Sequence, residues 1–333
     1  MSSGETLKMS EKIEVVCLGI LVVDILCSPI DKVPEPGELI SADEISLSGG
    51  GHAHNTAVSL ARLGLKTGVL GKVGHDHFGD FLKKNLKREG VDISKITVSS
   101  KLGTSKTMII LTHSEDRRFI HTLGANANFN IEDIDFDYLS QGKVLYVGGY
   151  GVLPELDEDS LIKLLKFAKL HGLITVLDVV IPHTEVKWID KCKRVLNFTD
   201  FFLPNSDEAR IITGQVDPEG QAEEILRHNY EMTVVITMGK EGSFVRTKDK
   251  IARASTYEVE VVDPSGGGDA FSAGFIFGVI NGWELEETLK LASAMGASAV
   301  REVGTTTGVF TRSEAEQFIK NNEIELEVKQ CSL

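Results

Sequence analysis

The sequence predicts an α/β protein in which a doubly wound, mostly parallel β-sheet is flanked by helices on both faces. Short apolar segments alternate with longer segments of helical spacing along most of the 333 residues. Such alternation is typical of parallel sheets whose strands are buried on both sides. The apolar and charged fractions, 42% and 25%, are those of an ordinary globular chain. No linker or internal repeat divides the sequence, so we expect a single domain over residues 1–333.

The core elements are predicted from the spacing of apolar residues. Apolar runs predict buried strands at residues 15–20, 67–73, 143–147, 174–177, 200–203 and 233–237. Helical spacing predicts helices at residues 53–63, 78–88, 157–171, 185–195, 221–227, 270–280 and 284–301. Gly64 and Gly90 close the first two of these helices, as expected where the chain leaves a helix through left-handed backbone.

Two stretches, residues 22–48 and 105–123, break the alternation. The first is rich in proline and has little helical period, and the second holds strand-like runs at residues 107–112 and 118–122 around a polar turn. We expect each to be a hairpin that projects from the edge of the sheet, and the two to pair into a small β-sheet lid over a site. Their exposed strand edges predict a homodimer formed through the lid.

Charge and cysteine content exclude several classes of function. The chain has 35 Lys and Arg against 49 Asp and Glu, a net charge of −14, which disfavours nucleic acid as a partner. Residues 1–12 lack the apolar segment of a secretory signal, and the longest uncharged apolar stretch, residues 270–280, is too short to cross a membrane. The four cysteines have no C-x-x-C spacing. We therefore expect a cytoplasmic protein with reduced thiols and no membrane partner.

Three consecutive glycines, Gly266, Gly267 and Gly268, precede the predicted helix at residues 270–280. Their unobstructed N–H groups and the positive end of the helix dipole together predict an anion site. Asp269 lies in the first turn, where a carboxylate can simply compensate the dipole. It can also be a general base that takes the proton from a hydroxyl attacking a phosphate. The residues alone leave both roles open.

A second glycine cluster, residues 49–51, precedes the predicted helix at residues 53–63. Glycines let a ligand approach the backbone, and Asn55 can both donate to and accept from a polyol hydroxyl; a tight structural loop is the alternative. Asp24 lies in an apolar run and needs polar partners, which sugar hydroxyls would provide. No P-loop and no G-x-G-x-x-G in the first strand–helix turn occurs, which argues against a P-loop NTPase and a dinucleotide-dependent oxidoreductase.

Two histidine pairs, His52 with His54 and His75 with His77, have the H-x-H spacing that can bind zinc. No third ligand is spaced nearby in the sequence. We therefore expect solvated or substrate-facing imidazoles in preference to a metal site.

Both glycine segments resemble the two signatures of the PfkB/ribokinase family of carbohydrate and nucleoside kinases. The first reads Gly50-Gly51-His52-Ala53-His54-Asn55, and the second is the segment 263–269 that ends in Asp269. Between them, Asn205-Ser206-Asp207-Glu208 is similar to the family's N-x-x-E motif, and the segment 237–242 to its T-x-G-x-x-G nucleotide loop. The resemblance covers roughly residues 13–325 with the motifs in the family's order.

The resemblance implies a ribokinase-like fold and transfer of the γ-phosphoryl group of ATP to a hydroxymethyl group. It implies that Asp269 is the general base and that the N–H groups of Gly266, Gly267 and Gly268 form the anion hole. The acceptor-binding residues that it implies are Asp24, Gly50, Gly51 and Asn55. The nucleotide-binding residues that it implies are Thr237, Gly239 and Gly242 along the phosphates and Ala294, Met295 and Ser298 beside adenine.

The resemblance also implies cation sites. Asn205 and Glu208 would bind Mg²⁺ through its water molecules, and Asp263 and Ser265 match positions that help bind K⁺ in potassium-activated members. ATP would then be held by backbone N–H groups, a helix N-terminus and Mg²⁺, so an acidic chain is compatible with an anionic substrate.

Two questions stay open: which acceptor is phosphorylated, and whether the protein is a kinase or a catalytically silent sensor. No basic cluster marks a carboxylated acceptor, and Gly124-Ala125-Asn126-Ala127 resembles a segment of ribokinase-like members. Neutral sugars or nucleosides therefore come first, with ketohexoses and 2-keto-3-deoxy sugar acids as alternatives. A catalytically silent sugar or nucleotide sensor on the same fold would be expected to have lost Asp269 or its glycines, and both are present.

Overall fold

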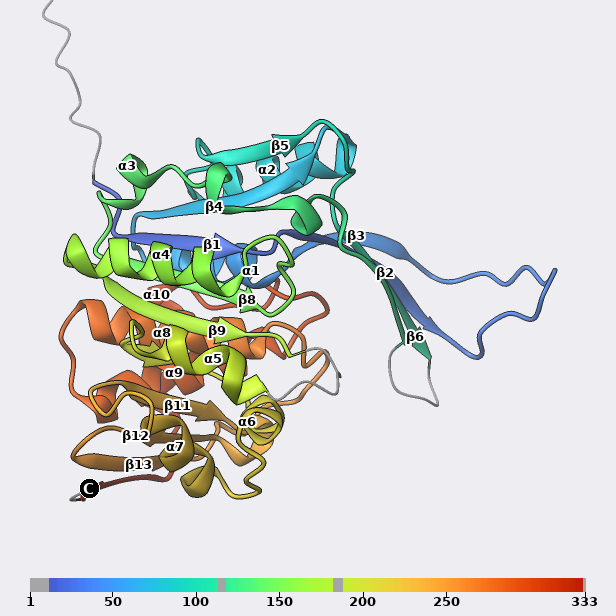
Figure 1. The fold of residues 1–333 in the computed structure, drawn as a ribbon. Helices are drawn as coiled ribbons and strands as arrows, with labels where there is room; N and C mark the ends of the chain where they lie inside the picture. The colour runs from blue at the N-terminus through green and yellow to red at the C-terminus, as the bar shows by residue number, and fades with distance from the viewer. Residues whose placement is uncertain (1–11, 113–117, 182–187, 332–333) are drawn as a thin grey trace, which may run out of the picture.

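The computed structural model describes residues 12–112, 118–181 and 188–331, and its core is a large twisted sheet (Figure 1). The strands of this sheet are β1 (Val15–Gly19), β4 (Thr67–Gly74), β5 (Ile96–Ser99), β8 (Val144–Tyr150), β9 (Ile174–Val179), β10 (Phe201–Phe202), β11 (Thr233–Thr237), β12 (Ser243–Arg246), β13 (Lys250–Ala254) and β14 (Leu326–Gln330). Their order is β14-β13-β12-β11-β10-β9-β8-β1-β4-β5. Strands from β11 to β5 are parallel, and β12, β13 and β14 add an antiparallel edge. The predicted mostly parallel sheet is confirmed; the antiparallel edge was not predicted.

Helices cover both faces of the sheet, as predicted. They are α1 (His52–Arg62), α2 (His77–Arg88), α3 (Phe136–Leu139), α4 (Glu158–Leu170), α5 (Trp188–Leu196), α6 (Ser206–Thr213), α7 (Pro218–Leu226), α8 (Gly267–Ile280), α9 (Leu285–Ala299) and α10 (Arg312–Asn321), with short 3-10 turns at Gly124–Asn128, Ile131–Asp133 and Gly239–Glu241. The predicted helix at residues 185–195 is described from Trp188 onward, because residues 182–187 lie outside the described ranges. Within those ranges, no helix is both long enough and apolar enough to cross a membrane.

The hydrophobic core has one part on each face of the sheet, because successive side chains along β1 point alternately to the two faces. Val15 and Cys17 pack with α1, α2, α8 and α9 on one face, whereas Val16 and Leu18 pack with α4, α5, α6 and α7 on the other. Successive side chains of a strand point to opposite faces, so a continuous apolar run is what a strand buried on both sides requires. The two glycine segments lead into α1 and α8, which are packed against each other on the first face.

A second, four-stranded sheet projects from the side of the core (Figure 1). Its strands are β2 (Val22–Ile30), β3 (Ile45–Gly50), β6 (Lys106–Thr112) and β7 (Arg118–Thr122), in the order β3-β2-β6-β7. Each hairpin is antiparallel, and β2 pairs with β6 in parallel. The prediction that the two irregular stretches pair into one small sheet is therefore confirmed; the predicted turn at residues 113–116 lies outside the described residues.

Candidate active site

Asp269 lies in the first turn of α8, directly after the three glycines. Gly266 has a φ of 79°, and a Cβ atom there would lie 2.1 Å from the carbonyl oxygen of Thr305, so the turn requires glycine. The Asp269 residue is only 9% exposed. Its Oδ1 atom is buried and has no hydrogen-bond partner among the described residues. Because burying an unpaired carboxylate oxygen is costly, this atom is suited to accept a hydrogen bond from a bound hydroxyl.

Asn55, in the first turn of α1, holds the other oxygen of Asp269. Its Nδ2 atom donates to Oδ2 of Asp269 over 2.8 Å, and its Oδ1 atom accepts from Oγ1 of Thr305 over 2.8 Å. Asn55 is buried, and both ends of its amide have protein partners. The structure thus joins the two glycine segments through one side chain, a contact that the sequence analysis did not foresee.

His52 faces Asp269 and a further acid, Asp178 at the end of β9. The Nε2 atom of His52 lies 4.0 Å from Oδ1 of Asp269, and ligand atoms of all three residues lie within 4.8 Å of one another. Burial disfavours charge on the imidazole, but the nearby carboxylates of Asp269, Asp178 and Glu208 raise the pKa of His52 overall. Spacing along the chain had shown no third ligand beside His52, yet the fold supplies two carboxylates. Such a group can hold a divalent cation or balance its charge with an imidazolium.

Asp178 is buried, and it is anchored by hydroxyl groups. Its Oδ2 atom accepts from the Tyr146 hydroxyl over 2.9 Å and from Oγ of Ser272 over 3.5 Å. Burial raises the pKa of Asp178 to about 6, and the charge of Asp269 acts in the same direction. The sequence analysis missed this residue, although its place at the carboxyl end of a predicted strand is where ligand sites of parallel sheets gather.

The other three histidines of the two H-x-H pairs do not face Asp269. His54 is fully buried, with Nε2 2.8 Å from Oδ1 of Asn85 and Nδ1 3.1 Å from Oδ1 of Asn55. Burial lowers the pKa of His54, so it acts as a neutral core residue beneath the first glycine segment. His75 and His77 are exposed, as predicted for solvated imidazoles.

Asp24 lies on β2 beneath the first glycine segment. A Cβ atom at Gly50 would lie 2.2 Å from Oδ2 of Asp24, so the absence of a side chain there leaves room for the carboxylate. Asp24 is 8% exposed, and burial raises its pKa to about 6, with a hydrogen bond from Thr107 opposing the shift. The strand register sets Asp24 beside Ser48 and Thr107, which gives this face of the small sheet a polar row.

A cavity of about 650 Å³ lies between the loop after β11 and the N-terminus of α8. Its volume is within the range of small-molecule sites, about 300–1,000 Å³. Thr237, Gly239 and Gly242, which were predicted to bind the nucleotide, line it together with Gly267 and Gly268 of the predicted anion hole.

Helix α9 turns a different set of side chains toward the cavity from the set that was predicted. Ser293, Gly296 and Ala297 line the cavity, whereas Ala294, Met295 and Ser298 are fully buried in the core. A shift of one residue turns a helical side chain by about 100°. The cavity-lining residues therefore replace the other three as candidates for the adenine end of the site.

Asn205 and Glu208 form a reciprocal cap at the N-terminus of α6. Oδ1 of Asn205 accepts from the Glu208 N–H, and Oε2 of Glu208 accepts from the Asn205 N–H, each over 2.9 Å. Burial, together with the charge of Asp178, raises the pKa of Glu208 to about 7. A carboxylate whose ionised form is disfavoured by a neighbouring acid suits a cation, and this donor set of oxygens fits Mg²⁺.

Asp263 connects the second glycine segment to the turn at Gly304. Its Oδ1 atom accepts from the Ser265 N–H over 3.0 Å, and its Oδ2 atom accepts from the Gly304 N–H over 3.1 Å. The next residue, Thr305, is the partner of Asn55. Nothing in the sequence pattern had marked Thr305, because its importance depends on how the chain returns to the site.

Several known proteins resemble this chain in sequence and in fold. The model of the family described as pfkB family carbohydrate kinase matches residues 12–312. A curated 5-dehydro-2-deoxygluconokinase of Clostridium perfringens is 30% identical over 290 residues, which cover 83% of this chain and 85% of that protein. The structure of adenosine kinase from Sinorhizobium meliloti superposes with a TM-score of 0.82 at 26% identity, over 92% of this chain and all 100% of the other. A candidate ribokinase II from E. coli, in complex with ATP and Mg²⁺, gives a TM-score of 0.80 at 24% identity, over 93% and 99% of the two chains.

Proposed function

The chain belongs to the pfkB family of carbohydrate kinases, and we propose that it transfers the γ-phosphoryl group of ATP to a hydroxymethyl group with Asp269 as general base. One observation carries this proposal above the others. The buried, unpartnered Oδ1 atom of Asp269 lies at the N-terminus of α8, whose glycines Gly267 and Gly268 line the 650 Å³ cavity. A proton acceptor and an anion site therefore adjoin each other.

The reaction follows from these positions. An acceptor hydroxyl donates to Oδ1 of Asp269 and attacks the γ-phosphorus, so a new P–O bond forms as the bond to the β-phosphate oxygen breaks. The hydroxyl proton passes to Asp269, and ADP leaves with the bonding electrons. The N–H groups of Gly266, Gly267 and Gly268 would stabilise negative charge on the transferring phosphoryl group, and this electrostatic effect is the main contribution expected of such a site.

ATP would occupy the cavity, with its adenine end toward Ser293, Gly296 and Ala297 and its phosphates along Thr237, Gly239 and Gly242. Asn205 and Glu208 would hold Mg²⁺ through its water molecules. When bound, Mg²⁺ neutralises charge on the phosphates and orients them. K⁺ at Asp263 and Ser265 stays a prediction that a comparison of rates in potassium and sodium buffers tests.

The acceptor is proposed to be a sugar-type polyol that binds beside Asp24 and the first glycine segment, Gly50 and Gly51. The sequence favoured neutral sugars and nucleosides. The curated relatives named 5-dehydro-2-deoxygluconokinase make a keto-deoxy sugar acid the first acceptor to test. An ADP-release assay with 5-dehydro-2-deoxygluconate, 2-keto-3-deoxygluconate, ribose, fructose and adenosine distinguishes these classes. If no compound in this panel causes ADP release, the result would favour the alternative of a catalytically silent sugar or nucleotide sensor.

The small sheet is proposed to act as a lid over the acceptor and to associate with a second copy of the chain. Its register sets Leu47, Ile25, Met108 and Ile120 in one row across the sheet. Leu47, Met108 and Ile120 are 46%, 44% and 64% exposed. Asp24 and Thr107, the adjacent positions on their strands, face the opposite side. The lid thus has a polar row on the side proposed to face the site and, on the opposite side, an apolar row suited to the same row of a partner.

The assignment of the base is tested with Asp269→Asn. This variant keeps the shape of the side chain but cannot take the proton, so we expect ATP binding close to the wild type and loss of turnover. The matched control is Asp159→Asn, at an aspartate whose side chain is 76% exposed. This control variant should change neither ATP binding nor turnover. Near-normal turnover in Asp269→Asn would refute the assignment.

A further inference from the structure

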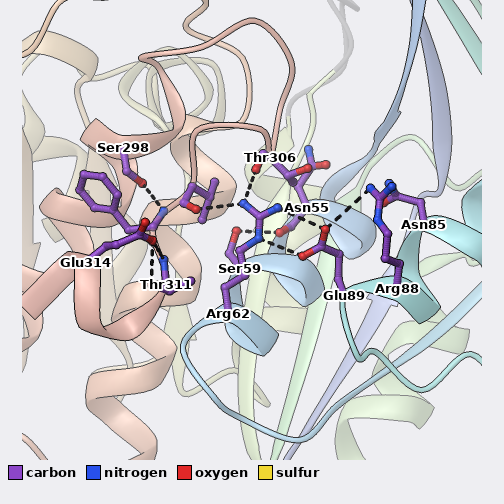
Figure 2. Close-up of polar contacts among 12 residues, drawn as sticks. Asn55, Ser59, Arg62, Asn85, Arg88, Glu89, Ser298, Thr306, Thr311 and Glu314 are labelled. Carbon is purple, nitrogen blue, oxygen red and sulfur yellow. Dashed lines mark hydrogen bonds and ion pairs between the residues drawn. The ribbon is translucent and has the colours of Figure 1, made fainter.

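Arg62, the last residue of α1, is tied to two separate parts of the chain (Figure 2). Its Nε and Nη2 atoms donate to the two carboxylate oxygens of Glu89 over 3.0 and 3.2 Å. Its Nη1 atom donates to the carbonyl oxygens of Thr306 and Val309 over 2.6 and 2.9 Å. The Arg62 side chain is 21% exposed and that of Glu89 17%. A half-buried bidentate pair of this kind has a fixed geometry.

The segment that Arg62 holds carries Thr305. The Thr305 hydroxyl lies 2.8 Å from both the Gly49 carbonyl oxygen and Oδ1 of Asn55. A hydroxyl has a single proton, so it is shared between these two acceptors. Gly266 packs against the backbone of Thr305, where a Cβ atom would collide with its carbonyl oxygen. The segment therefore contacts both glycine loops of the site at once.

Two groups hold Oδ1 of Asn55: the Thr305 hydroxyl at 2.8 Å and Nδ1 of His54 at 3.1 Å. With Oδ1 accepting from Thr305, Nδ2 points to Asp269 and donates to its Oδ2 atom. Without the Thr305 hydroxyl, Oδ1 of Asn55 would keep only its contact with His54, and the amide that donates to Asp269 would be held less firmly. The hydrogen bonds thus run from Arg62 through the backbone of the turn and Thr305 to Asn55 and Asp269.

We propose that Arg62 is a positioning residue, which fixes Asp269 for proton transfer by holding the turn that carries Thr305. The proposal rests on the proposed role of Asp269 as the base. Arg62 itself touches neither the reacting atoms nor the cavity lining, and Glu89 completes the arrangement by fixing the other edge of the guanidinium. Lysine in place of Arg62 keeps the charge but cannot reach Glu89 and both carbonyl groups together.

The test compares Arg62→Lys, Thr305→Val, Thr305→Ser and the double variant Arg62→Lys/Thr305→Val. Each of Arg62→Lys and Thr305→Val is expected to lower kcat about tenfold, the loss of roughly one hydrogen bond in the transition state, with KM for ATP unchanged. Thr305→Ser retains the hydroxyl and should keep kcat near the wild-type value. The double variant should lose little more than either single variant, because both changes break the same sequence of contacts.

A purely structural role gives different results. Arg62→Lys would then lower the denaturant midpoint and leave kcat unchanged. Alternatively, the losses in kcat of Arg62→Lys and Thr305→Val would multiply in the double variant. Either result overturns the proposal. Arg194→Lys, at a surface arginine that is 56% exposed, is the control and should behave as the wild type. Asp269→Asn separates the two claims. If that variant is inactive while Arg62→Lys and Thr305→Val retain full kcat, the base assignment holds and the positioning role fails.

Discussion

The Nδ2 atom of Asn55 donates a hydrogen bond of 2.8 Å to Oδ2 of Asp269, across 214 positions of sequence. The bond joins the first turns of α1 and α8, each of which follows a glycine loop. It leaves the other carboxylate oxygen directed toward His52, 4.0 Å away. The two glycine segments therefore meet in one site, in which Asn55 of the first segment also orients the carboxylate of Asp269.

Asn55→Asp is expected to destabilise the protein and to lower turnover. The new carboxylate would be buried against Asp269, and like charges in contact oppose ionisation of the pair. We expect a loss in unfolding free energy of about 1–3 kcal/mol near pH 8, and a smaller loss near pH 5, where the pair can hold a proton. Denaturant unfolding at both pH values measures it. Gln317→Glu, at an exposed position on α10, is the control; equal stability of Asn55→Asp and wild type near pH 8 would contradict the contact.

Asp24→Asn is expected to stabilise the protein near neutral pH. Burial raises the pKa of Asp24 to about 6, so from about pH 4 to 6 the folded state keeps a proton that the unfolded chain has lost. The free energy of unfolding therefore falls as the pH rises from about 4 to 6. Above about pH 6 the folded protein bears the full cost of burying the ionised Asp24 carboxylate. Asparagine has no charge to desolvate. The variant should gain at most about 3 kcal/mol near pH 7.5.

The measurement for Asp24 is a series of denaturant unfolding curves from about pH 4 to 8. The slope of stability against pH should be smaller in Asp24→Asn than in the wild type, although not zero, because the pKa of Asp178 is also raised to about 6. Asp31→Asn replaces an exposed aspartate next to the same strand and should leave the curve unchanged. Identical pH curves for Asp24→Asn and wild type would refute the buried carboxylate.

Gly266→Ala and Gly267→Ala are expected to differ sharply. At Gly266 the φ of 79° would strain the backbone of an alanine. The added Cβ atom would also clash with the Thr305 carbonyl oxygen, which would lie 2.1 Å away. This variant should lose about 1–3 kcal/mol in stability and most of the turnover. At Gly267 the nearest atom is Cγ1 of Val300 at 3.1 Å, a side chain that can yield. Since alanine also favours helix by about 1 kcal/mol, that variant should fold and turn over normally. Thermal melts and steady-state kinetics of the pair test this; loss of activity in both would contradict it.

Ile120→Glu and Met108→Glu are expected to convert a dimer into a monomer. Each adds a charge to the apolar row of the small sheet, and like charges from two copies would meet there. Light scattering with size-exclusion chromatography measures the mass of each variant. Leu170→Glu, at an 85% exposed leucine at the end of α4, should remain dimeric. A monomeric wild type would reject association through the lid.

Local spacing alone was sufficient for much of the fold and for singling out Asp269, whose proposed role as the base came from the family resemblance. Apolar runs located the parallel strands except β5, helical period located most of the helices, and two proline-rich or polar interruptions located the hairpins of the small sheet. Asp269 was found because its place after three glycines is a property of neighbouring residues. These features depend on contacts within a few positions, so the order of residues along the chain is enough to predict them.

The tertiary structure decided what each site residue touches. It separated His52, which faces Asp269, from His54, which lies in the core two positions later. It set the phase of α9, which turned Ala297 and not Ala294 toward the cavity. It also brought Asp178 and Thr305 to the site from distant parts of the chain, and Arg62 to the turn that carries Thr305. These contacts arise from the packing of α1 against α8 and the return of the turn near Thr305, and packing between distant segments leaves no periodic signal in the sequence.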